Sequence, residues 1–440
     1  MNKFSEKLAN FLAPIATKFS TQRHLCAIRD GFITLMPLVI VASLFVLLNN
    51  VVLDGNIGLL KSFKLDEYKD IGVSVYYGTL GFLSVLLAAT VSYKLASSYK
   101  MDELGTTVVS VAALATLIPT TIVTADNVTI SGVFSEIYTS PTGLFVAVIV
   151  AILATEILRK LNSIDKLKIK MPESVPPTVS KSFNLLIPSF ITLTLFAVVA
   201  FIFTQYVGTN VYDVITKLIQ APIKAVFQGL PGIVIVLLIQ NLLWSFGLHG
   251  AFILSPITEP TLLTAIQENM AAFQIGADIP NIVTKPFLDA FAFLGGGGCT
   301  IGLVIAILIA SKKPQYKSVT KLGFIPSLFN INEPLMFGLP VVLNPLFMIP
   351  LVLVPIVNVV IAYIATASGL ISKTVVMVPW TTPPILSAYL STAGDIRAAL
   401  LAAGLIVLSV FIYLPFVLAS NKVKDVEEEG SDFDEEDFIL

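Results

Sequence analysis

Charged residues are scarce in this 440-residue chain: Asp, Glu, Lys and Arg together make up 13% of it, whereas 55% of its residues are hydrophobic. A soluble domain carries about 25% charged residues, so this composition argues against a soluble fold. Cysteine and histidine occur only twice each. Cys26 and Cys299 are far apart and form no CxxC pair, so the sequence offers neither a disulfide framework nor a zinc motif.

Familiar catalytic motifs are missing as well. The run GGGGC at 295–299 is not followed by Lys-Ser or Lys-Thr and leads into an apolar stretch. We therefore interpret it as a close-packing or flexible joint rather than a phosphate-binding loop. Basic residues are confined to short segments between apolar runs, which gives nucleic acid no basic surface to bind. We expect no metal, no cofactor and no nucleic-acid partner.

Long apolar runs are what the chain has in place of charge. A helix needs roughly 20 residues to cross the hydrocarbon core of a bilayer, and several runs reach that length. They are continuous rather than alternating, which argues against a transmembrane β-barrel. We predict an all-α polytopic membrane protein with about ten transmembrane helices. The runs are 31–48, 71–89, 106–123, 143–158, 185–203, 233–243, 301–309, 341–364 and 398–420.

The positions of lysine and arginine orient these spans, because loops rich in basic residues stay in the cytoplasm. The start of the chain is basic and amphipathic, and it lacks the apolar core and cleavage site of a signal peptide. Further basic residues follow the second run at Lys94 and Lys100, fill the segment 159–181 and recur at 312–321. Lys422 follows the last run. We predict a multi-pass protein whose N- and C-termini are both cytoplasmic.

Five regions follow from this pattern. Residues 1–30 form an amphipathic cytoplasmic segment on the membrane face, and 31–158 are regular spans. Residues 159–182 form a cytoplasmic amphipathic loop, which serves either as a connector or as a docking surface for a soluble partner. Residues 183–420 form a less regular C-terminal half. Residues 421–440 form an acidic tail, which we expect to be disordered because it is so highly charged.

The C-terminal half is interrupted by prolines and polar residues. The segment 255–289 contains four prolines and five charged residues, and 378–390 reads VPWTTPPILSAYL. Broken backbone cannot face lipid, since each unpaired amide or carbonyl there costs several kcal/mol. We therefore expect re-entrant hairpins in this half, and transporters commonly place such breaks near the substrate.

The stretch FNINEP at 329–334 is the most informative break. Pro334 disfavours helical geometry at Glu333, so this carboxylate lies on a turn or at a helix start. A carboxylate accepts up to four hydrogen bonds, and the carboxamides of Asn330 and Asn332 both donate and accept. This set of groups suits a ligand rich in hydroxyls. The alternative is that Glu333 caps a short helix or pairs with Lys321.

Two further segments supply candidate ligands. In QNLLWSFGLHG, Asn241, Trp244 and His249 lie close together at the end of an apolar run, where ionisable side chains usually mark a substrate path. The alternative for His249 is a satisfied structural hydrogen bond. Trp380 lies between Pro379 and Thr381. It is either an anchor at the membrane interface or a flat platform for a sugar ring.

These motifs resemble a known family. FNINEPLMFGLP at 329–340, WSFGLHG at 244–250 and PWTTPP at 379–384 resemble the membrane-embedded IIC sugar permease of bacterial phosphotransferase systems. The lactose/cellobiose branch, which includes diacetylchitobiose permeases, is the most similar. The resemblance extends over essentially the whole chain, including MPESVPPTVSKSF at 171–183.

The resemblance implies a homodimer in a bacterial cell membrane, with spans 31–158 at the interface and 183–420 forming the sugar-binding transport domain. Glu333 and His249 would bind the hydroxyl that becomes phosphorylated. Asn332, Asn241 and Asn330 would add hydrogen bonds, and Trp380 and Trp244 would contact the sugar. The phosphoryl group would come from a phosphocysteine on a soluble IIB partner, itself loaded by IIA, because neither cysteine of this chain lies in a soluble domain.

A rival interpretation is a proton-coupled secondary sugar transporter, because intramembrane carboxylates and histidines also relay protons. The form in which the sugar enters separates the two. A phosphotransferase permease delivers a sugar phosphate and requires phosphorylated IIB. A proton-coupled transporter delivers unchanged sugar, and an uncoupler inhibits it. An intramembrane enzyme is a third class, but no nucleophile–base pair supports it. Branch resemblance favours a β-linked disaccharide such as cellobiose or diacetylchitobiose.

Overall fold

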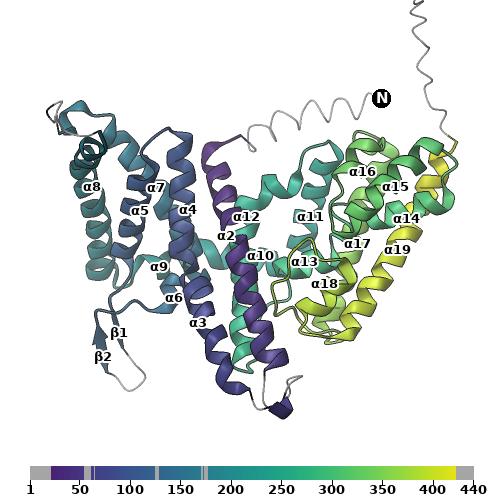
Figure 1. Cartoon of the computed structure of the whole chain (residues 1–440), viewed down its shortest axis with the longest axis horizontal. Coiled ribbons are helices and arrows are strands. Elements are labelled where there is room, and N and C mark those ends of the chain that lie inside the picture. Colours follow the sequence, from purple (N-terminus) through teal and green to yellow (C-terminus); the bar gives the residue numbers. More distant parts are fainter. Residues whose placement is uncertain are drawn as a thin grey trace, which may run out of the picture.

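The structure is a computed structural model that describes residues 21–53, 61–63, 65–123, 128–169, 172 and 177–422. Most of the expected amphipathic N-terminus and of the acidic tail therefore lies outside the described residues. The described chain is almost entirely helical, as predicted for a polytopic membrane protein, and it extends along one axis from a left-hand to a right-hand group of helices (Figure 1).

The left-hand group is built from the first part of the chain. A small antiparallel sheet, which the sequence did not suggest, projects from it and pairs Thr121 with Ser131 (Figure 1). The elements of the left-hand group are α2 (Arg23–Leu47), α3 (Lys69–Thr79), α4 (Leu83–Ser98), α5 (Glu103–Leu117), β1 (Thr121–Val123), β2 (Thr129–Ser131), α6 (Glu136–Thr139), α7 (Leu144–Asn162), α8 (Pro177–Ile202) and α9 (Val211–Ile215).

The right-hand group is less regular, because long helices alternate with helices of six to eight residues. Its elements are α10 (Ala221–Gln228), α11 (Leu230–Ser245), α12 (Gly250–Gln274), α13 (Lys285–Phe291), α14 (Thr300–Ala310), α15 (Pro314–Leu328), α16 (Glu333–Gly338), α17 (Pro345–Ala367), α18 (Pro384–Ser391) and α19 (Ile396–Ser420).

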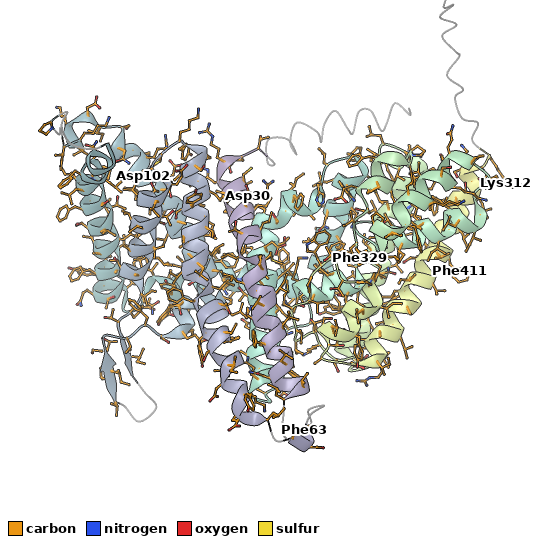
Figure 2. The ribbon with its side chains drawn as sticks, in the orientation of Figure 1. Asp30, Phe63, Asp102, Lys312, Phe329 and Phe411 are labelled. Carbon is orange, nitrogen blue, oxygen red and sulfur yellow. The ribbon has the colours of Figure 1, made fainter. Side chains whose placement is uncertain are left out.

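Six helices of the described chain are long and apolar enough to cross a membrane, and a bent pair makes up to seven. The bent pair joins Val211–Gln228 to Leu230–Ser245 at 85°. Apolar side chains also face outward, as Phe411 does on α19 with 65% of its surface exposed (Figure 2). The six helices long enough to cross a membrane are Arg23–Val46, Lys69–Ser98, Pro141–Asn162, Phe183–Val207, Pro345–Ala367 and Ile396–Ser420.

Each of the two groups of helices packs around its own hydrophobic core. The larger core is built by α10 to α19 and includes Phe287, Phe347 and Tyr413. The other core is built mainly by α2 to α9, and Phe196 of α8 and Tyr212 of α9 pack into it. Helices α2 and α12 lie against each other where the groups meet, as Figure 1 shows near its centre. The chain is therefore divided into two packed halves.

Helix α12 does not break where the prolines predicted it would. Pro256 and Pro260 both lie inside this continuous 25-residue helix. Proline has no N–H, so Pro256 leaves the carbonyl of Phe252 without its helical partner. The Ser255 hydroxyl donates to that carbonyl at 3.0 Å. The true breaks come later, at 275–284 and 292–299, where the chain leaves the helix altogether.

Basic residues lie at two separate places toward the same edge of the molecule (Figure 2). Arg23 at the start of α2 and Arg159 at the end of α7 both stack over the ring of Tyr99, which follows α4. At the other end of the same edge, the amide of Lys312 donates to the side chain of Asn421. Figure 2 shows Lys312 at the upper margin of the right-hand group, at the level where α4 and α7 end on the left.

Buried carboxamides hold the broken segments in place. Asn269 of α12 is fully buried, and its Nδ2 donates to the carbonyls of Asn281 and Thr374 at 2.8 Å each. Its Oδ1 accepts from the amide of Asn281 at 2.9 Å. One side chain thus satisfies backbone groups in two segments that are separated by about a hundred residues in sequence.

Replacing this side chain tests its structural role. Asn269→Ala should destabilise the protein by about 2–4 kcal/mol, because it leaves three buried backbone groups without partners. Gln267 is a matched control on the same helix, since it is buried and neither side-chain polar atom has a partner in the described chain. Gln267→Met should change stability by less than about 1 kcal/mol. Thermal unfolding in detergent measures both, and equal losses would contradict this role of Asn269.

Candidate functional site

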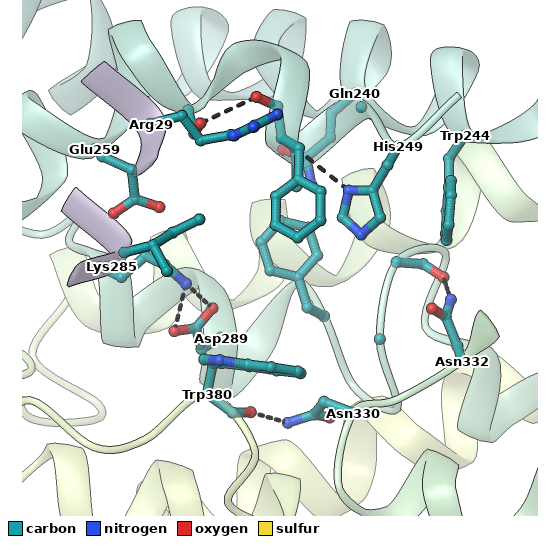
Figure 3. A pocket seen from close by; sticks show the side chains of 18 of the residues that line it. Arg29, Gln240, Trp244, His249, Glu259, Lys285, Asp289, Asn330, Asn332 and Trp380 are labelled. Atoms are coloured by element: carbon teal, nitrogen blue, oxygen red, sulfur yellow. Dashed lines mark hydrogen bonds and ion pairs between the residues drawn. The ribbon is translucent and has the colours of Figure 1, made fainter. Parts of the chain in front are cut away.

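The sequence-predicted site residues converge on one cavity of about 230 Å³, which is built mainly by the right-hand group and bordered by α2. Figure 3 shows side chains from α11, the loop before α12, the loop after α15 and the segment before α18 around it. A concave site that combines aromatic and polar side chains in this way is suited to a small-molecule ligand. All seven predicted residues line it: Asn241, Trp244, His249, Asn330, Asn332, Glu333 and Trp380.

Glu333 and His249 face each other across part of the cavity. Nε2 of His249 lies 4.0 Å from Oε1 of Glu333, and both side chains remain partly exposed. Each residue stands at a helix start: Glu333 opens α16 ahead of Pro334, and His249 caps the N-terminus of α12. The two are 84 residues apart in sequence (333 − 249), so only the fold brings them together. A gap of 4.0 Å leaves room for a ligand hydroxyl to bridge them.

The environment of His249 determines which ring nitrogen carries the proton. Nδ1 of His249 accepts from the amide of Phe252 at 3.3 Å, as a helix-capping contact. A neutral imidazole has one donor and one acceptor nitrogen, so the proton must then be on Nε2. The ring is stacked on Phe252 at 3.9 Å and lies 4.5 Å from the Trp244 ring. His249 is therefore held as a donor directed toward Glu333.

The glycine run forms a tight loop that borders the cavity. Gly295, Gly296 and Gly298 have φ of 84°, 99° and 80°, a region that glycine enters without steric cost. Gly296 is packed so closely that a Cβ there would lie 2.7 Å from Cγ of Asn332. A Cβ on Gly297 would lie 2.7 Å from Cδ1 of Trp244. The interpretation of this run as a close-packing joint agrees with these contacts.

Three asparagines hold that loop. Oδ1 of Asn241 accepts from the amide of Gly298 at 3.0 Å, and Oδ1 of Asn330 accepts from the amide of Gly295 at 2.8 Å. Nδ2 of Asn332 donates to the carbonyl of Gly297 at 2.7 Å. These contacts use much of the hydrogen-bonding capacity that sequence reasoning assigned to the ligand. Direct contact of the asparagines with a sugar stays a prediction.

The two tryptophans have different environments. Trp244 is buried at 5% exposure between the His249 ring and the glycine loop, so its main contacts are with the protein. Trp380 is 46% exposed, and Nδ2 of Asn330 donates to its carbonyl and to that of Thr382. Figure 3 shows the indole of Trp380 extending across the base of the cavity. Of the two tryptophans, Trp380 is therefore the one whose ring remains available to a ligand.

Sequence reasoning missed one end of this cavity. Arg29, Glu259, Lys285 and Asp289 also line it, and Figure 3 shows them on the side opposite Trp244 and Asn332. Arg29 comes from α2 of the other half. The signal was present in the sequence, because ionisable residues inside an apolar chain usually mark a functional site. The segment 255–289 was instead treated only as a break.

A second cavity, of about 580 Å³, lies between the end of α12 and the segment before α18. Its lining includes polar side chains, among them Asp278 and Lys373, but Lys373 already donates to the carbonyl of Ile279. None of the predicted residues lines it. The first cavity is therefore the candidate site.

Similarity to known proteins agrees with this geometry. The family model "Phosphotransferase system, EIIC" matches residues 29–355. The chain is 36% identical over 430 residues to the oligo-beta-mannoside-specific EIIC component of Bacillus subtilis (strain 168), covering 96% of both chains. It is 36% identical over 438 residues to the cellobiose-specific EIIC component of Geobacillus stearothermophilus, covering 98% of this chain and 97% of that protein.

A solved structure shares the fold. The transporter ChbC, the IIC component of the N,N'-diacetylchitobiose-specific phosphotransferase system, superposes with a TM-score of 0.88. It is 34% identical in sequence, and the match covers 94% of this chain and 97% of ChbC. Fold, family model and sequence identity over nearly the whole length agree. The chain belongs to the EIIC family, the membrane permease components of phosphotransferase systems.

Proposed function

We propose that this permease binds a β-linked disaccharide of the cellobiose or diacetylchitobiose type and presents one hydroxyl for phosphorylation by a separate phospho-IIB protein. The observation that carries the proposal is the pair formed by His249 Nε2 and Glu333 Oε1, 4.0 Å apart on the wall of the cavity. The names of the relatives support the substrate class, since they specify cellobiose, oligo-β-mannoside and diacetylchitobiose.

The two side chains divide the chemistry between them. His249, protonated on Nε2, donates to the oxygen of the sugar hydroxyl and holds it in place. Glu333 accepts the proton of that hydroxyl as its oxygen attacks phosphorus. The new O–P bond forms while the S–P bond of the IIB phosphocysteine breaks, and the cysteine thiolate leaves with the electron pair. Glu333 is therefore the base, and His249 is the positioning donor.

The membrane topology extends the proposal. The six or seven apolar helices, together with the two shorter apolar helices α5 and α14, give eight or nine candidate crossings in the described chain, which supports a count near the proposed ten. The short helices α13 and α18 pack against each other and follow broken segments, which supports their assignment as the tips of two re-entrant hairpins. The shared edge of Arg23, Arg159 and Lys312 supports a cytoplasmic face that carries both termini.

The two cores support a division of labour between the halves. We assign the transport domain to the right-hand half and the dimer interface to the spans of the left-hand half. Helices α8 and α9 lie largely within the transport domain expected at 183–420, but their buried side chains pack into the core of the left-hand half. We therefore propose that the transport domain begins after α9. The basic edge, with the described residues 159–169 that follow α7, is the face on which we propose that IIB, loaded by IIA, docks.

Removal of the proposed base tests the mechanism. Glu333→Gln should bind the disaccharide nearly as well as wild type but reduce phosphorylated sugar at least about 100-fold, the lower range for a general base. Purified protein in vesicles, supplied with phospho-IIB and labelled cellobiose, gives both quantities. Glu67→Gln, an exposed residue away from the cavity, is the control and should behave as wild type.

The same vesicles test the function itself. Sugar should accumulate only as a phosphate and only with phospho-IIB. Uptake of unmodified sugar that an uncoupler abolishes would contradict the phosphotransferase proposal. If Glu333→Gln folds as wild type does and still gives a normal yield of sugar phosphate, only the assignment of Glu333 as the base is rejected.

The glycine loop provides a second prediction. Gly297→Ala places a methyl group against the Trp244 ring, so the ring must shift and disturb His249 beside it. We expect disaccharide affinity to fall about 10-fold, or about 1.4 kcal/mol, with little change in melting temperature. Gly404→Ala is the matched control, because no atom lies within 4 Å of its added Cβ. Calorimetric titration measures both variants, and equal affinities would show that the loop does not shape the site.

A further inference from the structure

A single carboxylate holds together the start of α2 and the ends of α4 and α7. Oε1 of Glu156 accepts from Nε2 of His24 at 3.0 Å and from the hydroxyl of Tyr99 at 2.6 Å. Oε2 of Glu156 accepts from Nε and Nη2 of Arg159 at 2.9 and 2.8 Å. Glu156 therefore links three helices, and both of its oxygens are already occupied by protein donors.

His24 adds no net charge to this cluster. Oε1 of Gln22 accepts from the amide of Leu25 at 2.7 Å, so the side-chain atom that lies 2.7 Å from Nδ1 of His24 is the amide nitrogen of Gln22. Nδ1 of His24 is then an acceptor, and the ring carries its proton on Nε2, which donates to Glu156. An imidazole with one proton is neutral.

Two arginines give the cluster an excess of positive charge. Arg23 and Arg159 lie over the ring of Tyr99, with their Cζ atoms 5.1 and 4.8 Å from its centroid. Arg159 pairs with Glu156, whereas no carboxylate of the described chain pairs with Arg23, which is exposed. Asp30, further along α2, is paired with the residue before it. One positive charge therefore remains unbalanced beside a second guanidinium.

The cluster lies where three candidate membrane spans end. Arg23 is the first residue of α2, Tyr99 follows the last residue of α4, and Arg159 is in the last turn of α7. All three helices belong to segments long and apolar enough to cross a bilayer. Their ends lie near one another at the upper edge of the left-hand group (Figure 1), and α4 packs against both of the other helices. This is the level of lipid headgroups, where tyrosine is typical.

Charge and position together restrict the ligand. An anion with oxygen acceptors would balance Arg23, and the planar fork of a guanidinium matches phosphate. A headgroup that also carries an ammonium would bring a further cation to the two arginines, so a headgroup with net negative charge fits better. We propose that Arg23 and Arg159, oriented by the Tyr99 ring, bind the phosphodiester of an anionic phospholipid such as phosphatidylglycerol. Basic pockets between membrane helices suit such headgroups.

A lipid fits this position better than the IIB protein that is proposed to dock along the same edge. The cluster is at headgroup level in the left-hand group, whereas the phosphocysteine must reach Glu333 in the right-hand group. The lipid site makes no use of the sugar cavity. It can therefore be tested independently of the proposed function.

Arg23→Gln tests the site without disturbing the fold, because Arg23 is exposed and takes no part in the hydrogen bonds to Glu156. The full-length protein, freed of lipid in a neutral detergent, is titrated with phosphatidylglycerol, and native mass spectrometry measures the bound lipid. Affinity should fall about 5-fold, the effect of one basic residue at an anionic surface. Arg397→Gln is the matched control, because it removes the same charge from an exposed arginine at the start of α19 and should keep wild-type affinity.

Two further probes identify the source of the phosphate. Wild type should bind phosphatidylcholine about 5-fold more weakly than phosphatidylglycerol, and Arg23→Gln should reduce this preference. Inorganic phosphate in large excess should not displace phosphatidylglycerol, because a lipid is also held by its chains.

Three results would overturn the lipid site. Equal losses of phosphatidylglycerol affinity in Arg23→Gln and Arg397→Gln would show general charge attraction. Displacement of the lipid by inorganic phosphate would assign the cluster to a free anion. Weaker binding of IIB to Arg23→Gln, with phosphatidylglycerol binding unchanged, would assign it to the protein partner. None of these results bears on the binding of the disaccharide.

Discussion

Every backbone group that leaves a helix inside an apolar environment must find another hydrogen-bond partner, and this requirement shapes the C-terminal half. In water the solvent would supply the partner, but within a membrane the protein must do so. The chain meets the need with buried carboxamides. Gln228 accepts from the amides of Ile282 and Val283 and donates to the carbonyl of Val283. Asn269 does the same for Asn281, next to Ile282, and for Thr374 in another segment.

The candidate site depends on the same device. Asn241, Asn330 and Asn332 satisfy the glycine loop, and Asn330 also reaches the carbonyl of Trp380. These contacts hold four separate segments around one cavity. Polar side chains at the ends of helices, including Glu333 and His249, can then face the cavity without leaving backbone groups unpaired. In the proposed mechanism, a rigid frame of this kind would keep the reacting hydroxyl, its donor and its base in a fixed geometry.

Much of this could be predicted from the sequence. Low charge and long apolar runs indicated an all-α membrane protein, and the residues predicted around Glu333 all line one cavity. Proline placement was a weaker guide. Pro256 and Pro260 suggested a break, yet α12 continues through both, because a neighbouring hydroxyl satisfies a carbonyl that proline leaves free. The hairpin of β1 and β2 was not predicted, because strands of three residues are too short to show a clear alternating pattern in the sequence.

By itself, the sequence determined the membrane class, the family resemblance and the identity of seven residues around the cavity. These follow from composition and local motifs, which act over a few residues. The tertiary structure alone decided that His249 faces Glu333, that the asparagines brace a glycine loop, and that Glu259, Lys285 and Asp289 complete the cavity. Such relations join segments far apart in the chain, and they depend on packing that no local pattern encodes.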